Sequence, residues 1–342
     1  MPASSRRLAS RLNSDMTMPG RTKKLMMAFA AAAILVVAVS AKAQDYPQQA
    51  IHIIVPFGPG GGSDLITRIL AEAMEKRLGK PVIVENKPGA GGIIGNEVVA
   101  KANPDGYTLG MMTAGQIIAA VTRKRVPYDT LALTPVAQVA TASLLMLTRP
   151  DFPADNVKDV IALAKAEPGK YILASPGFAA TQQFAGELFK QIAGIDMLDV
   201  AFGTTPEAIN ALLGRHADVL FETIGASLGQ VRGGTLRAIA VTGKDRFPTV
   251  PDIPAAVESG LVPGFDVTTW YGIFGPPGLP APVVERLNQA LMDAIADDKV
   301  RERVVTAGMV VKGSSAADFG AFMASEYRRW NEVREKAGIA QQ

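Results

Sequence analysis

Apolar residues recur along the first part of this chain in two alternating patterns, which predict strands and helices in turn. Residues 51–55 form a short, almost wholly apolar run, typical of a strand covered on both faces. A glycine-rich turn follows, and the apolar residues from 65 to 78 then have helical spacing, with Ser63 or Asp64 as the expected N-cap. A second strand, a second glycine turn at 88–92 and a second helix follow in the same order. This rhythm predicts an α/β fold with a parallel, doubly wound sheet.

The same alternation restarts after a predicted strand at 142–147. Further helices are predicted at 156–166, 181–192 and 207–213, and further strands at 171–174, 218–221, 236–241 and 267–274. The chain then ends in three predicted helices at 281–295, 299–307 and 316–336. Two sheet-forming blocks joined by two strand crossings predict two lobes that open and close about a hinge.

The first 43 residues differ from the rest and have the features of a signal peptide. Arg21, Lys23 and Lys24 precede an apolar run at 25–39, and Ala41-Lys42-Ala43 offers a cleavage site, so we expect cleavage after Ala43. A retained membrane anchor is the alternative, but the apolar run is shorter than the roughly 20 residues that span a bilayer.

Removing this segment changes the charge of the protein. It holds seven of the 35 lysines and arginines but one of the 32 acids, so the remainder has a net charge of −3 where the whole chain has +3. We therefore expect no nucleic-acid partner. The absence of cysteine excludes disulfides, thiolate chemistry and a lipoprotein anchor.

The length of the remaining chain exceeds that of a single core and favours two lobes. We predict a first lobe from residues 44–143 and 269–342, and a second lobe from 144–268.

Each glycine turn lies between a predicted strand and a predicted helix. Such turns leave backbone N–H groups free at the positive end of the helix dipole, which is an arrangement that binds anions. Two turns at the same end of one parallel sheet are expected to converge on one crevice. Glycines that only shape the turns are the alternative.

Other sites are disfavoured by the sequence. A dinucleotide site would need a glycine where Ser63 stands, and no Gly-Lys-Ser/Thr forms a P-loop. After residue 43 the chain holds only two histidines, His52 and His216, and it has no nucleophile elbow or metal-ligand spacing. We expect a binding protein that is no enzyme and carries no cofactor or metal.

Several motifs together resemble the substrate-binding receptors of tripartite tricarboxylate transporters, called Bug receptors. The resemblance covers essentially the whole chain after the first 43 residues. It rests on Tyr46-Pro47, Val55-Pro56-Phe57-x-Pro59-Gly60-Gly61-x-Ser63-Asp64, residues 84–92 (Val-Glu-Asn-Lys-Pro-Gly-Ala-Gly-Gly), 104–109 (Pro-Asp-Gly-Tyr-Thr-Leu), Ser175-Pro176-Gly177, 185–189, 218–221, 236–242, 251–254 and Trp270-Tyr271-Gly272.

The resemblance implies a type II periplasmic-binding-protein fold, with two doubly wound lobes joined by a two-strand hinge. It also implies a monomeric periplasmic receptor that holds a small organic carboxylate between its lobes and delivers it to a two-subunit integral membrane permease. A periplasmic sensor that signals to a membrane kinase is the alternative from another class.

For the first lobe, the resemblance implies a clamp of backbone amides from both glycine turns. Asp64 is expected to cap the helix and organise the loop, because a second negative charge would repel a carboxylate. Phe57 either covers the ligand as a lid or fills the core. The expected first-lobe residues are Phe57, Gly58, Gly60, Gly61, Ser63, Asp64, Ala90, Gly91 and Gly92.

For the second lobe, the expected hydroxyl donors are Ser175, Thr181, Thr204 and Thr205. Glu222 stands where the family usually has Asp, and it either accepts a hydrogen bond from the ligand or organises the loop. Phe178 takes a position where the family has Gly, and Gly203 one where it often has a basic residue. These departures favour a monocarboxylate or aromatic acid.

Overall fold

The computed structural model describes residues 46–177, 180–336 and 341, and the compact unit considered below begins at Pro47. Its first elements are β1 (Ile51–Val55), α2 (Gly62–Leu78), β2 (Val82–Asn86), the 3-10 turn η1 (Ala90–Gly92), α3 (Ile93–Ala100), β3 (Thr108–Thr113), α4 (Ala114–Thr122) and β4 (Thr134–Thr148). The next are α5 (Val157–Ala166), β5 (Ile172–Ser175), α6 (Thr181–Ala193), β6 (Leu198–Ala201), α7 (Thr205–Leu213), β7 (Val219–Thr223), α8 (Ile224–Arg232) and β8 (Arg237–Val241). The chain continues through η2 (Ala256–Ser259), β9 (Thr268–Gly275), α9 (Ala281–Ala296), α10 (Asp298–Thr306), β10 (Val310–Val311) and α11 (Ala316–Lys336).

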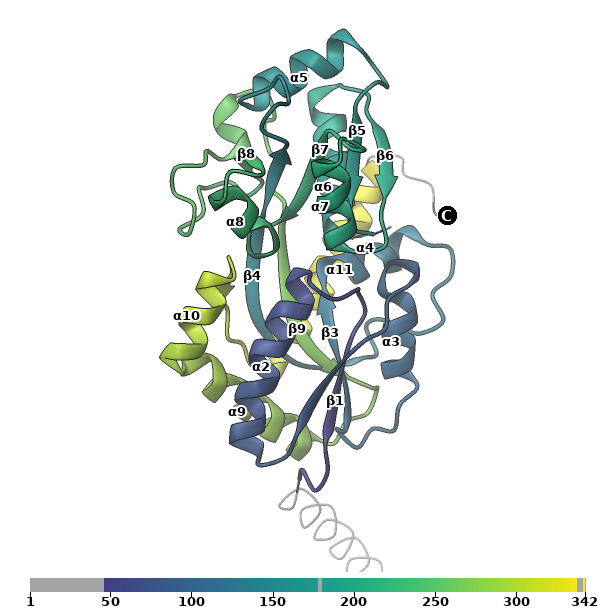
Figure 1. Cartoon of the computed structure of the whole chain (residues 1–342). Coiled ribbons are helices and arrows are strands. Elements are labelled where there is room, and N and C mark those ends of the chain that lie inside the picture. The colour runs from purple at the N-terminus through teal and green to yellow at the C-terminus, as the bar shows by residue number, and fades with distance from the viewer. Residues whose placement is uncertain (1–45, 178–179, 337–340, 342) are drawn as a thin grey trace, which may run out of the picture. The chain divides into compact units, whose positions relative to one another are not determined.

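The long strand β4 belongs to two groups of strands. Its pairing with β9 ends at Ser143, opposite Thr268, and its pairing with β7 begins at Leu144, opposite Thr223. The order of strands is β2-β1-β3-β9-β4-β7-β5-β6, and β8 and β10 also pair with β4. We call the strands β1, β2, β3, β9 and β10, with β4 up to Ser143, lobe 1, and we call β5–β8, with the rest of β4, lobe 2. Figure 1 shows β4 running from one group into the other.

Within each lobe the strands that alternate with helices are parallel, as the sequence predicts. β1 lies parallel to β2 and β3, and β5 lies parallel to β6 and β7. β9 is antiparallel to both β3 and β4, because the chain re-enters lobe 1 along this strand after lobe 2 is complete. The two connecting strands and the two wound groups are those of a two-lobed binding-protein fold.

Strand β9 is fixed from one face by buried aromatic residues. Trp270 donates a hydrogen bond from Nε1 to Glu326 of α11 at 3.0 Å, and Trp330 donates to the same carboxylate oxygen at 3.2 Å. Trp270 also lies edge-on against Phe319, with ring centroids 5.8 Å apart. Because side chains alternate along a strand, this anchoring turns Tyr271 toward the opposite face.

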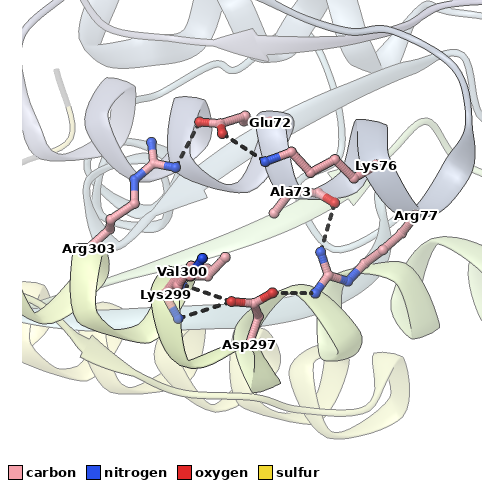
Figure 2. Close-up of polar contacts among 8 residues, drawn as sticks. All are labelled: Glu72, Ala73, Lys76, Arg77, Asp297, Lys299, Val300 and Arg303. Carbon is pink, nitrogen blue, oxygen red and sulfur yellow. Dashed lines mark hydrogen bonds and ion pairs between the residues drawn. The ribbon is translucent and has the colours of Figure 1, made fainter.

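The C-terminal part of α2 is tied to α10 by charged side chains (Figure 2). Glu72 pairs with Arg303 at 2.7 Å, and Arg77 lies 3.3 Å from Asp297. Asp297 also caps α10 by accepting from the backbone N–H groups of Lys299 and Val300, and these backbone bonds lower the pKa of its carboxyl, as does Arg77. These pairs lie at the surface and are each worth little free energy, but they attach α2 by the end opposite to its first turn.

Several elements were not predicted by the hydrophobic pattern. Helices α4 and α8 contain glycines at Gly115, Gly225 and Gly229, which weaken the signal of a helix. The expected strand at 142–147 is only the end of β4, which begins at Thr134. Strand β6 was also missed, and all four of its residues are exposed at the edge of the sheet.

Candidate functional site

The first glycine turn connects β1 to α2 and leaves the first turn of that helix open. The N-cap is Gly61, with no side-chain cap, so the expected capping by Ser63 or Asp64 was wrong. The backbone N–H groups of Gly62 and Ser63 have no partner within the helix, as is general for a first helical turn. Gly61, Gly62 and Ser63 line a cavity of about 480 Å³, including its opening to solvent.

Asp64 does not line this cavity but organises the turn beside it. Its carboxylate accepts from the backbone N–H of Gly60 at 3.1 Å, from Nε of Arg68 at 3.0 Å and from Nδ2 of Asn86 at 2.9 Å. Asn86 also donates to the carbonyl oxygen of Phe57 at 3.0 Å. Burial raises the pKa of Asp64, but these hydrogen bonds outweigh it, and the net pKa lies below its ordinary value. Because its oxygens are used on the loop, Asp64 cannot cap its own helix.

Lobe 2 contributes the starts of three helices to the opposite wall. Thr181 and Gln182 begin α6, Thr204 and Thr205 begin α7, and Thr223 precedes α8. Thr204 is a true N-cap, since its hydroxyl accepts from the backbone N–H of Glu207.

Glu222 lies directly behind this wall and is fully buried. Its carboxylate accepts from Nε2 of Gln182 at 3.0 Å, from Oγ1 of Thr205 at 3.0 Å, and from both the backbone N–H and the hydroxyl of Thr223 at 2.6 and 3.0 Å. Burial raises the pKa of Glu222, and these four hydrogen bonds act in the opposite direction. All three of its partner residues line the cavity, so Glu222 fixes the orientation of this wall.

The floor of the cavity comes from β3 and β9. Thr113 is the N-cap of α4, with Gln116 completing a capping box, and it lines the cavity together with Thr269 and Tyr271. Tyr271 is 2% exposed, and its hydroxyl lies so close to Gly62 that a Cβ on that glycine would be 2.3 Å away. Burial raises the pKa of Tyr271, as does the charge of Glu222, so the phenol is neutral and can donate. None of the described residues forms a hydrogen bond with this hydroxyl.

Five helices therefore begin at residues that line the cavity: α2, α4, α6, α7 and α8. Each helix start carries a partial positive charge and free N–H donors. Among the described residues that line the cavity, none is Lys, Arg or His. The cavity is thus arranged to hold an anion by the backbone dipoles at these helix starts.

The structure brings about half of the predicted site residues together around this cavity. The predicted residues that line it are Phe57, Gly58, Gly61, Ser63, Thr181, Thr204 and Thr205. Those that do not are Gly60, Asp64, Ala90, Gly91, Gly92, Ser175 and Glu222, and Phe178 falls outside the described residues. Lining residues that were not predicted are Gly62, Thr113, Pro176, Ala180, Gln182, Thr223, Thr269 and Tyr271.

The second glycine turn supports the cavity from outside its lining. Ala90, Gly91 and Gly92 all have positive φ, and a Cβ on Gly92 would lie 3.1 Å from Gln116 and 3.3 Å from Pro56. The turn therefore packs against the residue that completes the α4 cap, and its glycines are needed for this backbone. A prediction from sequence places both turns at one sheet edge but does not tell which of them faces the crevice.

The part of the chain that the structure describes contains no helix long and apolar enough to cross a membrane. Within that same part, no three His, Cys, Asp or Glu side chains are grouped so that they could hold a metal ion.

The two wound lobes with a polar cavity at their helix starts define a protein of the two-lobed solute-binding class. The sequence model described as "Tripartite tricarboxylate transporter family receptor" matches residues 66–339, so the chain belongs to this receptor family. The resemblance to Bug receptors seen in the sequence motifs is thereby confirmed.

Individual relatives agree with this assignment. The chain is 31% identical over 305 residues to the protein BugT of Bordetella pertussis, covering 88% of this chain and 93% of that protein. The solved structure of the periplasmic binding protein BugD has 35% identity and a TM-score of 0.83, covering 87% of this chain and 100% of that one. MatC of Rhodopseudomonas palustris, solved with bound malate, has 30% identity and a TM-score of 0.80, covering 84% of this chain and 99% of that one. The two solved relatives are thus a periplasmic binding protein and a protein that holds a carboxylate.

Proposed function

We propose that this protein is an exported, non-enzymatic receptor that binds a small organic carboxylate in the cavity between its two lobes. The observation that carries the proposal is the convergence of five helix starts on a cavity whose described lining residues include no basic side chain. Such a lining favours an anion over a neutral solute, and it suits a carboxylate because planar oxygens can accept from several N–H groups at once. The bound malate of MatC supports the same chemistry for a relative.

The expected lobes, 44–143 with 269–342 and 144–268, move as two bodies about β4 and the start of β9. The change of partner of β4 between Ser143 and Leu144 supports this boundary. A solute touched by both lobes stabilises the closed arrangement, since only a difference in affinity between the two states drives closure.

The binding experiment compares each acid with its neutral amide. Isothermal titration calorimetry of three- to six-carbon carboxylates is expected to detect binding of at least one acid and no binding of its amide. If amides or other neutral solutes bind and none of the acids does, the proposal is overturned.

A valine at Gly61 provides the matched variant, because a Cβ there points toward the hydroxyl of Thr205 at 3.2 Å. Gly61→Val is expected to abolish binding. Gly229→Val is the control, since Gly229 is exposed and a Cβ there meets nothing within 4 Å. Equal affinity of the two variants would contradict the assignment of the cavity.

Export and delivery complete the proposed function. The signal peptide is expected to be cleaved after Ala43, which N-terminal sequencing of the exported protein would test by finding Gln44 first. The partner is a permease of two integral membrane subunits, as the family name implies. Uptake of the solute should then require both permease and receptor, whereas a sensor would instead alter phosphorylation of a membrane kinase without affecting uptake.

A further inference from the structure

The hydrogen-bond directions around Glu222 limit what the lobe 2 wall can offer to a solute. Oε1 of Glu222 accepts from three groups, and two of them, the backbone N–H of Thr223 and Nε2 of Gln182, can only donate. The third is the hydroxyl of Thr223 at 3.0 Å. Oε1 therefore carries no proton, and Thr223 must donate its single hydroxyl hydrogen to it.

Two further threonines also donate their hydroxyl hydrogens behind the wall, Thr205 when Glu222 is ionised. Thr205 donates to Oε2 of Glu222 at 3.0 Å, and Thr113 donates to Oε1 of Gln116 at 2.7 Å. A hydroxyl group has one hydrogen and two lone pairs. Once the hydrogen is used behind the wall, only lone pairs remain for the cavity, so these three hydroxyls meet a solute as acceptors.

The wall around α2 has the opposite character. The first-turn N–H groups of Gly62 and Ser63 are donors, and the hydroxyl of Tyr271 has its hydrogen available. A carboxylate is attracted to this side and is repelled by the buried carboxylate of Glu222 on the other side.

We propose that the solute carries, in addition to its carboxylate, a hydrogen-bond donor that is received by Thr205 and Thr223, and that Glu222 sets this specificity by orienting their hydroxyls. The donor is a hydroxyl or an ammonium group on the carbon chain of the acid. This inference rests on the proposed function, because it concerns the same cavity. Glu222 acts as a positioning residue, and Thr205 and Thr223 are the residues that contact the solute.

The test measures discrimination between acids that differ only in the donor. Calorimetry is performed with propionate, lactate, 3-hydroxypropionate, alanine and β-alanine, and with the corresponding four- to six-carbon series. At least one hydroxy or amino acid is expected to bind about tenfold more tightly than the unsubstituted acid of the same length, as one additional hydrogen bond provides. The hydroxy and amino arms show which of the two donors is recognised.

A pair of variants separates recognition from folding. Thr223→Val removes the hydroxyl acceptor while keeping the shape of the side chain. It is expected to bring the ratio of the affinity for the hydroxy or amino acid to that for the unsubstituted acid close to one. Thr223→Ser keeps the hydroxyl and is expected to retain the discrimination. If Thr223 had only a structural role, Thr223→Val would weaken binding of both kinds of acid equally and leave this ratio unchanged. That result would overturn the inference.

The outcomes also distinguish the two proposals. If the unsubstituted acids bind as tightly as all of the hydroxy and amino acids, this inference is overturned, but the proposal of carboxylate binding still holds. If no carboxylate in the series binds at all, the proposed function fails, and this inference fails with it.

Discussion

A β-carbon on Gly58 would lie 2.7 Å from Cγ2 of Thr204, so the first glycine turn and the start of α7 approach each other as closely as a glycine permits. A second contact of this kind joins Gly60 to Pro206, where a Cβ would lie 3.3 Å away. These contacts bring lobe 1 and lobe 2 together over the cavity. The absence of a side chain at Gly58 thus permits this close approach of the two lobes.

Gly58→Ala is expected to weaken solute affinity about three- to tenfold, because the added methyl group meets a stiff β-branched side chain only in the closed state. Thr204→Ser removes Cγ2 but keeps the hydroxyl that caps α7. The double variant should therefore regain most of the affinity. Calorimetry of all four proteins checks this, and an additive loss in the double variant would contradict a contact between the two positions.

Tyr271→Phe is expected to lower affinity about tenfold while leaving the solute-free protein equally or more stable. The hydroxyl lies on a residue that lines the cavity and forms no hydrogen bond with the described residues, so its removal costs the solute-free protein no internal hydrogen bond. With solute bound, the same substitution removes a donor. Thermal unfolding with and without solute separates the two effects, and an unchanged affinity would show that the hydroxyl does not face the ligand.

Asp64→Ala is expected to lower the free energy of unfolding at pH 7 by about 1–3 kcal/mol, because the N–H of Gly60 and the side chains of Arg68 and Asn86 lose a charged acceptor. The pKa of Asp64 is lowered in the folded protein from its ordinary value of 3.8. Its contribution is therefore present above that value and is lost as the pH falls through the folded pKa. Urea unfolding at several pH values should show the variant and the wild type converging in acid.

Asp266→Ala is the matched control for that experiment, since Asp266 is exposed. It should leave both stability and solute binding unchanged. If it destabilised the protein as much as Asp64→Ala does, the effect would reflect net charge and not the organisation of the first glycine turn.

Glu222 is expected to affect the pH dependence of stability in the opposite sense to Asp64, and Glu222→Gln tests this. Burial raises the pKa of Glu222 above its ordinary value of 4.5. A group with a raised pKa stabilises the fold at low pH, and this contribution is lost as the pH rises through the folded pKa. The wild type should lose stability relative to the variant on going from acid to neutral pH, by about 1.4 kcal/mol for each unit by which the pKa is raised. Parallel stability curves would refute this.

The first glycine turn could be predicted from sequence because it depends on local chemistry. A buried strand, a cluster of glycines and a helix with apolar spacing lie within residues 51–78, and Gly61 and Ser63 are in the cavity as expected. The threonines at the starts of α6 and α7 were expected from the resemblance to the receptor family, and Thr204 also fits the general preference for Thr at a helix N-cap.

The floor of the cavity could not be predicted, because it depends on pairing between distant strands. Tyr271 and Thr269 reach the cavity only because β9 pairs with both β3 and β4, and because alternation along β9 places Trp270 on the other face. Thr223 was missed because the glycines of α8 hid the helix start that follows it. Local patterns do not contain this information.

The most direct test of carboxylate binding is a crystal structure of the protein with a bound solute. Carboxylate oxygens within hydrogen-bonding distance of the backbone N–H groups of Gly62 and Ser63, and of the hydroxyl of Tyr271, are the predicted result. A solute bound outside this cavity, or a carboxylate held by a lysine or arginine side chain, would contradict the account.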